Sequence, residues 1–395
     1  MAMKKIFLKP KKEESLRRFH PWIFSGAISH WDFEPEEGDA VQVLGHKGEY
    51  LAAGHYQKGS IAVRICAFEP LTSFDTPFWV GKLKSAYNYR KSLGLIQNPK
   101  TNCFRLVHGE GDGLPGLIID IYGTAAVMQC HSIGMHRHRE QIAQALAVVL
   151  GKQMEALFDK SHETLPPHYA ATMHNGHLLG GGEGAIVREN GHSFWVDWTE
   201  GQKTGFFLDQ RDNRELLGRY VKGKSVLNAF AYSGGFSVYA LASGARQVQS
   251  VDVSSKAITW THRNVELNQL GAERHEGIVA EVIKFFSASE TQYDVLVVDP
   301  PAFAKSIAKR HNAVQAYKRL NLAAMKCLRP GGILFTFSCS QVVDKLLFYN
   351  TIVAAAIESG RKVRVMHYLE QPADHPVQLF HPESSYLKGL ALYVE

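Results

Sequence analysis

Ser225-Val226-Leu227-Asn228-Ala229-Phe230-Ala231-Tyr232-Ser233-Gly234-Gly235-Phe236-Ser237 reads as an apolar strand followed by a turn with paired glycines. Three more continuous apolar runs, typical of buried parallel strands, follow at residues 247–251, 293–298 and 332–337. Segments with helical spacing separate these runs. The alternation predicts an α/β fold class with a doubly wound sheet over residues 185–395. The last two strands have a short connection and are expected to pair antiparallel.

Two stretches with a different pattern precede this sheet. Residues 1–70 read as short strands separated by glycines, as in the alternating runs 40–44 and 61–65, and predict a small β-barrel. Residues 71–184 contain helical spacing as well and predict a small α+β domain. The glycine-rich run 109–116 is expected to connect a hairpin, because no helix follows it that could present its N-terminus to a phosphate.

Composition limits the class of protein. The chain has 395 residues, of which 45% are hydrophobic and 21% charged, so it is expected to fold into two or three domains. The net charge of +6 excludes a histone-like protein but allows a local basic surface. Five cysteines without a Cys-x-x-Cys pair and nineteen histidines without a common zinc spacing predict no disulfide framework and no metal site. No signal peptide or long apolar run occurs, so we expect a cytoplasmic protein without membrane spans.

The N-terminal segment places cations beside aromatic residues. Lys5, Arg17 and Arg18 precede Phe19 and Trp22. Basic side chains beside aromatic rings suit the backbone and an unstacked base of RNA. A solvated face beside a small core would give the same pattern, so both interpretations stay open.

The residues that follow each strand of the predicted sheet indicate a nucleoside ligand, because ligands bind beyond the carboxyl ends of such strands. Gly234 and Gly235 allow a close approach to the backbone, but the Gly-x-Gly-x-x-Gly spacing that binds a pyrophosphate is missing. Asp252 ends the second strand, where a carboxylate can bind ribose hydroxyls. S-adenosylmethionine is the commonest such cofactor on this architecture. Helix packing or capping could explain each residue taken singly.

The motif Asp299-Pro300-Pro301-Ala302-Phe303 follows a central strand. Its prolines cannot continue a strand ladder, so they hold the carboxylate and the ring at the sheet edge. We expect the motif to bind a flat base, with Phe303 stacking on it and Asp299 accepting a hydrogen bond from an exocyclic amino group. A tight turn capped by Asp299 is the alternative.

Cys339 follows the next apolar strand. If these two strands are neighbours, Cys339 and Asp299 face the same pocket. A thiolate that adds to carbon 6 of a pyrimidine makes carbon 5 nucleophilic enough to accept a methyl group. We therefore predict that Cys339 is a nucleophile and that the other four cysteines are small buried hydrophobes.

Taken together, these motifs resemble the ribosomal large subunit methyltransferase I family. The likeness covers nearly the whole chain and is carried by residues 20–28, 111–117, 202–211, 228–239, 299–303 and 338–340. It implies a PUA domain at 1–70, a central EEHEE-type domain at 71–184 and a Rossmann-like methyltransferase domain at 185–395. It also implies formation of 5-methylcytosine in large-subunit ribosomal RNA, with Cys339 as the nucleophile, and often a homodimer.

The resemblance further implies that the segment 202–211 packs over the cofactor. The predicted cofactor-binding residues are Gln202, Lys203, Thr204, Phe206, Asp209, Arg211, Asn228, Phe230, Tyr232, Ser233, Gly234, Gly235, Asp252, Glu281 and Asp299. At Glu281 the chain departs from its relatives, which usually have a shorter Asp near the adenine. The predicted substrate-binding residues are Pro300, Pro301, Phe303, Lys5, Arg17 and Arg18.

Two other functions stay open. A methyltransferase acting on an exocyclic amine, such as guanine N2, uses a similar Asp-Pro-Pro-Phe loop and needs no cysteine. An RNA-binding assembly factor could keep a vestigial cofactor site. A Cys339→Ala variant separates the first alternative from the cytosine enzyme, and binding of S-adenosylmethionine addresses the second.

Overall fold

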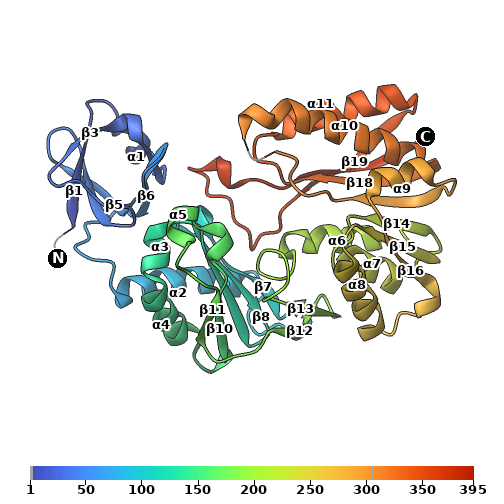
Figure 1. The fold of residues 1–395 in the computed structure, drawn as a ribbon, viewed down its shortest axis with the longest axis horizontal. Helices are drawn as coiled ribbons and strands as arrows, with labels where there is room; N and C mark the ends of the chain where they lie inside the picture. Colours follow the sequence, from blue (N-terminus) through green and yellow to red (C-terminus); the bar gives the residue numbers. More distant parts are fainter. Residues whose placement is uncertain (1–2, 305) are drawn as a thin grey trace. The chain divides into compact units, whose positions relative to one another are not determined.

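The computed structural model describes residues 3–304 and 306–395 (Figure 1). Internal contacts divide the chain into two compact units, each described here by itself. Unit 1 consists of Met1–Val187, Val196–Phe206 and Ala373–Ser384, and unit 2 of Arg188–Trp195, Phe207–Pro372 and Ser385–Glu395. The three domain ranges expected from the sequence stay a prediction.

The N-terminal part of unit 1 is a six-stranded sheet. Its strands are β1 (Lys4–Leu8), β2 (Trp22–Phe24), β3 (Ile28–Trp31), β4 (Ala40–Leu44), β5 (Tyr50–Tyr56) and β6 (Ile61–Ala67), and helix α1 spans Glu14–Arg17. The strand order is β2-β6-β5-β4-β1-β3. Alternate apolar side chains, among them Ile6, Val41 and Val63, meet in one core, as the period of two along a strand requires.

The second part of unit 1 is a five-stranded sheet with helices. Its elements are α2 (Thr76–Ser92), β7 (Cys103–His108), β8 (Leu117–Tyr122), β9 (Ala125–Cys130), α3 (Ile133–Arg137), α4 (Arg139–Leu150), β10 (Ala156–Asp159), α5 (Pro167–Ala170) and β11 (Gly176–Leu179). The strand order is β11-β10-β9-β8-β7. β7 and β8 are antiparallel neighbours, which confirms that the glycine-rich run 109–116 connects a hairpin.

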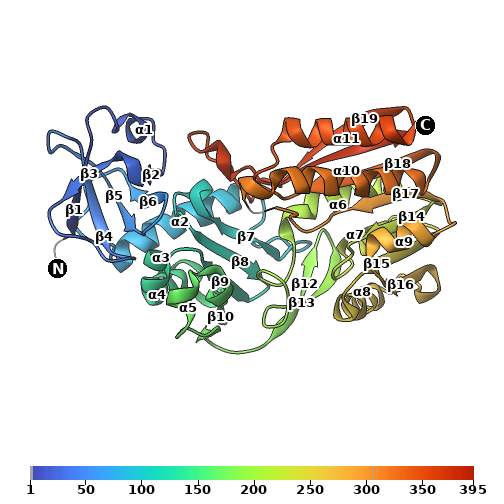
Figure 2. The same ribbon diagram turned by 45° about the horizontal axis from the view of Figure 1, so that its top comes forward.

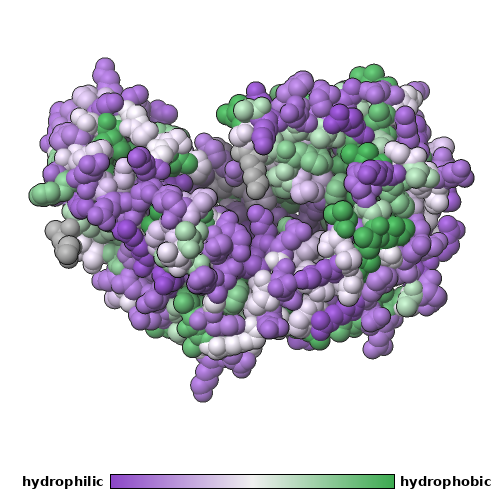
Figure 3. Space-filling model, viewed as in Figure 1, coloured by the Kyte–Doolittle hydropathy of each residue, from purple (hydrophilic) through white to green (hydrophobic). Residues whose placement is uncertain are grey.

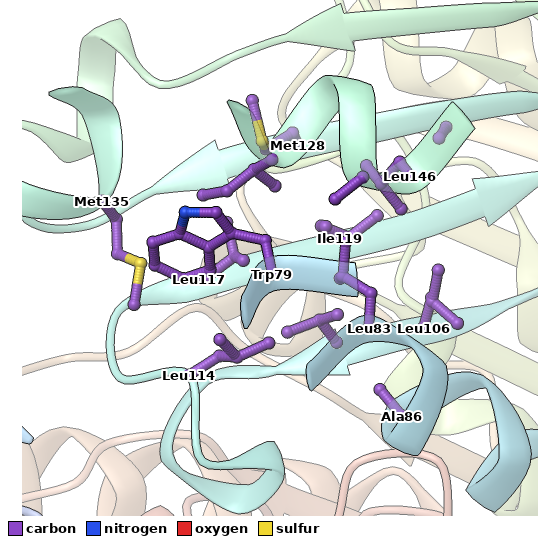
Figure 4. Close-up of a cluster of buried hydrophobic side chains, with 14 of the residues drawn as sticks. Trp79, Leu83, Ala86, Leu106, Leu114, Leu117, Ile119, Met128, Met135 and Leu146 are labelled. Atoms are coloured by element: carbon purple, nitrogen blue, oxygen red, sulfur yellow. The ribbon is translucent and has the colours of Figure 1, made fainter. Parts of the chain in front are cut away.

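Helices α2 and α4 supply much of the core of this sheet. Figure 4 shows Trp79 and Leu83 of α2 among apolar side chains that include Ile119 of β8 and Leu146 of α4. Helix α2 begins where Asp75 accepts a hydrogen bond from the backbone N–H of Phe78, so its first turn is capped. The capped start and the buried stripe together fix this helix on the sheet.

Unit 2 is built on a seven-stranded sheet of the predicted α/β class. Its strands are β14 (Ser225–Ala229), β15 (Gln247–Asp252), β16 (His275–Val279), β17 (Tyr293–Val298), β18 (Leu328–Ser338), β19 (Val363–Glu370) and β20 (Lys388–Val394), in the order β16-β15-β14-β17-β18-β20-β19. The first five strands in this order are parallel. β20 is antiparallel to both of its neighbours, and its pairing with β19 confirms the prediction from their short connection.

Helices cover both faces of this sheet. They are α6 (Arg211–Gly218), α7 (Gly235–Ala242), α8 (Ser255–Leu267), α9 (Val282–Ala288), α10 (Arg310–Lys326) and α11 (Lys345–Ser359). The last three helices share one apolar core with the sheet, and α6, α7 and α8 lie on the opposite face (Figures 1 and 2). The order of strands reverses between β14 and β17, which is where ligands bind in such folds.

A two-stranded sheet, β12 (Gly184–Glu189) with β13 (His192–Asp197), contributes residues to both units. Over residues 3–304 and 306–395, no helix combines the length and apolar character needed to cross a bilayer.

We expect Leu83→Ala to lower the free energy of unfolding by about 2–5 kcal/mol, because Leu83 is fully buried and its truncation leaves a cavity. Val148→Ala on α4 is the control, since that side chain is 67% exposed. It should change stability by less than about 0.5 kcal/mol. Equilibrium urea unfolding measures both variants, and two equally small effects would contradict the placement of Leu83 in the core.

Candidate active site

The turn after β14 has an unusual backbone. Phe230 and Tyr232 have φ angles of 61° and 47°, and Gly234 has a φ of 77°. Non-glycine residues rarely adopt this left-handed region, and such residues cluster at ligand sites. At Gly234 a Cβ atom would come within 2.5 Å of Thr261 Cγ2. A side chain there would therefore clash with Thr261 and would also strain the positive φ angle. Helix α7 begins at the next residue, Gly235.

Asp252 at the end of β15 is tied to this turn. One carboxylate oxygen accepts a hydrogen bond from the Tyr232 N–H at 2.9 Å, and the other accepts one from the Ser254 N–H at 2.9 Å. Because each carboxylate oxygen can accept more than one hydrogen bond, capacity for ribose hydroxyls is left. The side chain is half-buried and lies at the end of β15, as predicted, and its contact with a ribose stays a prediction.

Apolar surface lies beside Asp252. Val253 directly follows β15 and is 72% exposed. Val279 ends the neighbouring strand β16 and is 54% exposed, and Ile283 in α9 is 38% exposed. In the mostly hydrophilic view of Figure 3, apolar atoms gather over the part of unit 2 that carries α8 and α9. Exposed apolar side chains beside a carboxylate suit an adenosine, whose ring is apolar and whose ribose is polar.

Asp299 at the end of β17 has a polar partner and a charged neighbour. Its Oδ2 accepts a hydrogen bond from Gln210 Nε2 at 3.0 Å, and Gln210 is itself held by Asn213. Burial and the nearby carboxylate of Asp209 raise the pKa of Asp299 to about 7. Asp209 Oδ2 in turn accepts a hydrogen bond from the Tyr386 hydroxyl at 2.6 Å. The site therefore holds two carboxylates, one of which changes protonation state near neutral pH.

Cys339 follows β18, the strand next to β17, so the predicted neighbourhood of Cys339 and Asp299 is confirmed by the register Val298 to Thr336. Among the five cysteines only Cys339 is partly exposed; the other four are buried, as expected. Burial, together with the charges of Asp299 and Asp209, raises the pKa of the Cys339 thiol to about 12. A thiolate at this position needs a compensating cation.

Lys388 is that cation. It is 5% exposed, and its Nζ donates hydrogen bonds of 2.8 Å to the carbonyls of Ser340 and Val343 in the segment after Cys339. Its charge lowers the pKa of the Cys339 thiol, and burial lowers its own pKa to about 8. A charged lysine that holds this segment by two carbonyls favours the thiolate of Cys339.

Phe303 and the prolines sit in the loop after β17. Pro300 is buried and Pro301 is exposed. The half-buried ring of Phe303 packs on Tyr317 of α10 with centroids 4.7 Å apart, and the Tyr317 hydroxyl lies 3.1 Å from Ser340 Oγ. These contacts join the Asp-Pro-Pro-Ala-Phe loop to the cysteine segment.

Four of the predicted cofactor residues belong to unit 1. Gln202 and Lys203 are exposed, and Phe206 is buried. The Thr204 hydroxyl donates to Asp120 Oδ2 at 2.6 Å and accepts from the Tyr122 hydroxyl at 2.9 Å. Thr204 therefore has a structural task inside unit 1, and the cofactor role of the four residues stays a prediction.

Three other predicted cofactor residues have structural partners in unit 2. Asn228 donates to Ser237 Oγ at 2.8 Å beneath the turn, and Glu281 caps α9 by accepting from the Ile283 N–H. Arg211 is buried at the start of α6, with its Nε 3.5 Å from Asp212. The roles found here are support of the turn for Asn228 and helix capping for Glu281, and their contact with a cofactor stays a prediction.

The predicted RNA-contacting cations lie on the surface of the N-terminal sheet. Lys5 is exposed, Arg17 pairs with Glu49 at 3.1 Å, and Arg18 pairs with Glu14 at 2.8 Å. Exposed ion pairs contribute only about 0–1 kcal/mol, so phosphates can replace these carboxylates.

Two known protein families match separate parts of this chain. Residues 6–68 match the PUA-like domain family, and residues 131–386 match the S-adenosylmethionine-dependent methyltransferase family. A protein of Escherichia coli strain SMS-3-5 named ribosomal RNA large subunit methyltransferase I is 38% identical over 99% of both chains. The protein of that name from Aeromonas salmonicida strain A449 is 37% identical over 98% of both chains. The chain belongs to the ribosomal RNA large subunit methyltransferase I family.

Solved structures agree with this family's fold. A putative S-adenosylmethionine-dependent methyltransferase from Streptococcus mutans superposes with a TM-score of 0.85 at 23% identity, over 99% of this chain and 100% of that one. A putative methyltransferase complexed with SAH gives a TM-score of 0.84 at 24% identity with the same coverage. The predicted PUA-like and methyltransferase folds are therefore confirmed.

S-adenosylmethionine is the cofactor of this family member, and unfilled hydrogen-bonding groups in unit 2 fit it. Ser233 Oγ, in the turn after β14, and Asp209 Oδ1 are buried without a hydrogen-bond partner among the described residues. Buried polar atoms rarely stay unpaired. Both atoms belong to predicted cofactor residues, and the ammonium and carboxylate of a methionine moiety are suited to pair with them.

Sequence reasoning missed several residues of the site in this methyltransferase. Phe207 and Trp260 were missed: both pack edge-on against the predicted Tyr232, with ring centroids 5.1 and 5.8 Å away. Lys388 and Tyr386 were missed as well, since both come from the last segment of the chain, far in sequence from the motifs. The only sequence signal was the position of Lys388 at the start of an otherwise apolar strand.

We expect Gly234→Ala to weaken binding of S-adenosylmethionine at least about tenfold, because the added Cβ must displace Thr261 and strains a positive φ. Gly81→Ala is the control, since a Cβ there meets nothing within 4 Å. Isothermal titration with S-adenosylmethionine measures both affinities. Wild-type affinity in Gly234→Ala would refute the role of this turn, and no binding by the wild-type protein would favour the assembly-factor alternative.

Proposed function

We propose that this protein forms 5-methylcytosine in large-subunit ribosomal RNA through a covalent adduct at Cys339. The observation that carries the proposal is the pair formed by Cys339 and Asp299 at the ends of neighbouring parallel strands. A partly exposed cysteine beside a carboxylate suits attack on a pyrimidine. The names of the relatives and the match to a PUA-like domain support ribosomal RNA as the substrate.

Cys339 makes and breaks a bond in the proposed cycle. Its thiolate adds to carbon 6 of the cytosine, and the electron pair of the 5,6 double bond moves toward carbon 5. When bound, S-adenosylmethionine supplies the methyl group that carbon 5 receives. Loss of the carbon 5 proton then returns an electron pair that re-forms the double bond and expels the Cys339 thiolate.

Asp299 is proposed to bind the Watson–Crick edge of the base. In its ionised form the carboxylate accepts a hydrogen bond from the exocyclic amino group, and in its protonated form it can donate to the ring nitrogen. With a pKa of about 7, both forms are populated near neutral pH. Gln210, the residue before α6, donates a hydrogen bond to this carboxylate and so fixes its position.

The N-terminal sheet is proposed to bind the RNA around the target base. Lys5, Arg17 and Arg18 supply positive charge, and Phe19 and Phe24 are 48% and 51% exposed. Exposed rings beside cations can stack on unpaired bases while the cations contact phosphates. The homodimer and the cytoplasmic location expected from the sequence stay predictions.

We expect Cys339→Ala to lower methyl transfer to hypomethylated ribosomal RNA at least about a thousandfold, because the route through carbon 6 is lost. Cys327→Ala removes a buried cysteine as the control and should leave activity unchanged. Transfer of a labelled methyl group measures both variants. Near wild-type turnover in Cys339→Ala would reject the covalent route and favour methylation of an exocyclic amine.

RNA that contains 5-fluorocytidine gives a second readout of the same variants. Fluorine at carbon 5 cannot leave as a proton, so the adduct with Cys339 should persist and shift the protein on a denaturing gel. The shift should disappear in Cys339→Ala and stay in Cys327→Ala.

Lys388→Met should raise the pKa of the Cys339 thiol, because the variant removes a cation whose charge lowers that pKa. The rate of Cys339 alkylation by iodoacetamide, followed by mass spectrometry from pH 6 to 9, measures the thiolate fraction. At a given pH we expect about tenfold slower labelling than in the wild-type protein for each unit of pKa increase. Lys388→Arg keeps the charge and should restore most of the rate. A purely structural role would lower thermal stability without moving this pH profile.

A further inference from the structure

We propose that His20, His381 and Glu383 of unit 1 form a binding site for a divalent metal ion of the zinc class. His20 precedes β2, and the other two residues lie in the segment Ala373–Ser384, which belongs to the same compact unit. The proposal is independent of the methyltransferase chemistry, because none of its residues belongs to unit 2.

The three side chains converge on one point. Their ligand atoms all lie within 4.8 Å of one another. The Glu383 carboxylate stands between the two imidazoles, with one oxygen 3.8 Å from His20 Nε2 and the other 3.8 Å from His381 Nε2. Two imidazoles and a carboxylate, with a fourth position for water, are a common donor set for zinc. The Glu383 side chain is 52% exposed and free to close on an ion.

An unpaired nitrogen inside the cluster points to a ligand. His381 is 2% exposed, and its Nε2 has no hydrogen-bond partner among the described residues. Its other nitrogen, Nδ1, lies 2.6 Å from Ser384 Oγ. Because a buried polar atom without a partner costs free energy, something besides the surrounding protein is expected at Nε2. A metal ion held also by Glu383 would fill that position.

Both histidines can present the lone pair that a metal needs. His20 Nδ1 lies 3.2 Å from the Trp22 N–H and 3.3 Å from the Trp22 carbonyl, so it can accept from the first or donate to the second. A metal ion at Nε2 selects the tautomer in which Nδ1 carries the proton and donates to the carbonyl. His381 has the same option through Ser384 Oγ. Metal-bound histidines commonly donate their second N–H to such an acceptor.

The surroundings favour a cation. Trp22 packs on His381 with ring centroids 4.3 Å apart, and its Nε1 donates to Glu110 Oε1 at 2.8 Å. Glu110 thus adds a second carboxylate next to the cluster, and its charge acts on His381. A bound ion would cross-link the segment Ala373–Ser384 to the start of the N-terminal sheet and so stabilise unit 1.

The test uses tag-free, full-length protein stripped of metal with a chelator. Titration with Zn²⁺ alone should give one saturable site per chain, and Co²⁺ should give the visible absorption of a tetrahedral ion. Glu383→Gln should weaken Zn²⁺ binding at least about tenfold while leaving the fold intact, since the side chain is half exposed. Unchanged affinity for S-adenosylmethionine confirms that this variant is folded.

The matched control is His168→Ala. His168 lies 2.8 Å from Glu37, so it has the same imidazole and carboxylate chemistry on the surface of unit 1, but this pair belongs to no group of three ligands among the described residues. This variant should bind Zn²⁺ like the wild-type protein, and added Zn²⁺ should raise the melting temperature of both but not of Glu383→Gln. The proposal is overturned if wild-type protein shows no saturable site, or if Glu383→Gln binds Zn²⁺ as tightly as the control.

Discussion

The parallel pairing of β17 with β18 is the constraint on which the rest of the site depends. Because both strands end at the same edge of the sheet, Asp299 and Cys339 become neighbours although forty residues separate them in the chain. The same edge carries the turn after β14 and the carboxylate of Asp252, which are linked by the Tyr232 N–H. The turn proposed to bind the cofactor and the loop proposed to bind the base thus lie at one edge of the sheet, where the strand order reverses and ligands bind in such folds.

Burial determines the pKa values of the reactive groups at this edge of the sheet. It raises the pKa of Asp299 toward neutrality, where both protonation states are populated, and the pKa of the Cys339 thiol far above neutrality, where the thiol stays protonated. The nearby carboxylate of Asp209 reinforces both effects. Lys388 lowers the pKa of the Cys339 thiol from β20, the strand that runs antiparallel beside β18. The antiparallel strand β20 therefore contributes a charge that acts on Cys339, in addition to its part in the sheet.

Sequence patterns identified the classes of structure and the residues that follow the central strands, because both are encoded locally. Continuous apolar runs marked β14, β15, β17 and β18, whereas the edge strand β16, His-Glu-Gly-Ile-Val, lacks such a run and was not predicted. The Asp-Pro-Pro motif and Cys339 each follow a strand directly, so their positions at its end could be read from the chain. The glycine turn and Asp252 had already indicated S-adenosylmethionine, and the resemblance to a family then joined the motifs and implied the ribosomal RNA substrate.

What the sequence determined by itself was therefore the α/β class, the barrel-like start, and the identity of the residues at strand ends. Tertiary structure alone decided which groups meet across long separations. Lys388 reaches the cysteine segment, Tyr386 reaches Asp209, and His381 reaches His20 only because the last part of the chain folds back into each unit. Burial, and with it every shifted pKa, follows from that packing, because desolvation depends on all neighbours of a group and not on its place in the chain.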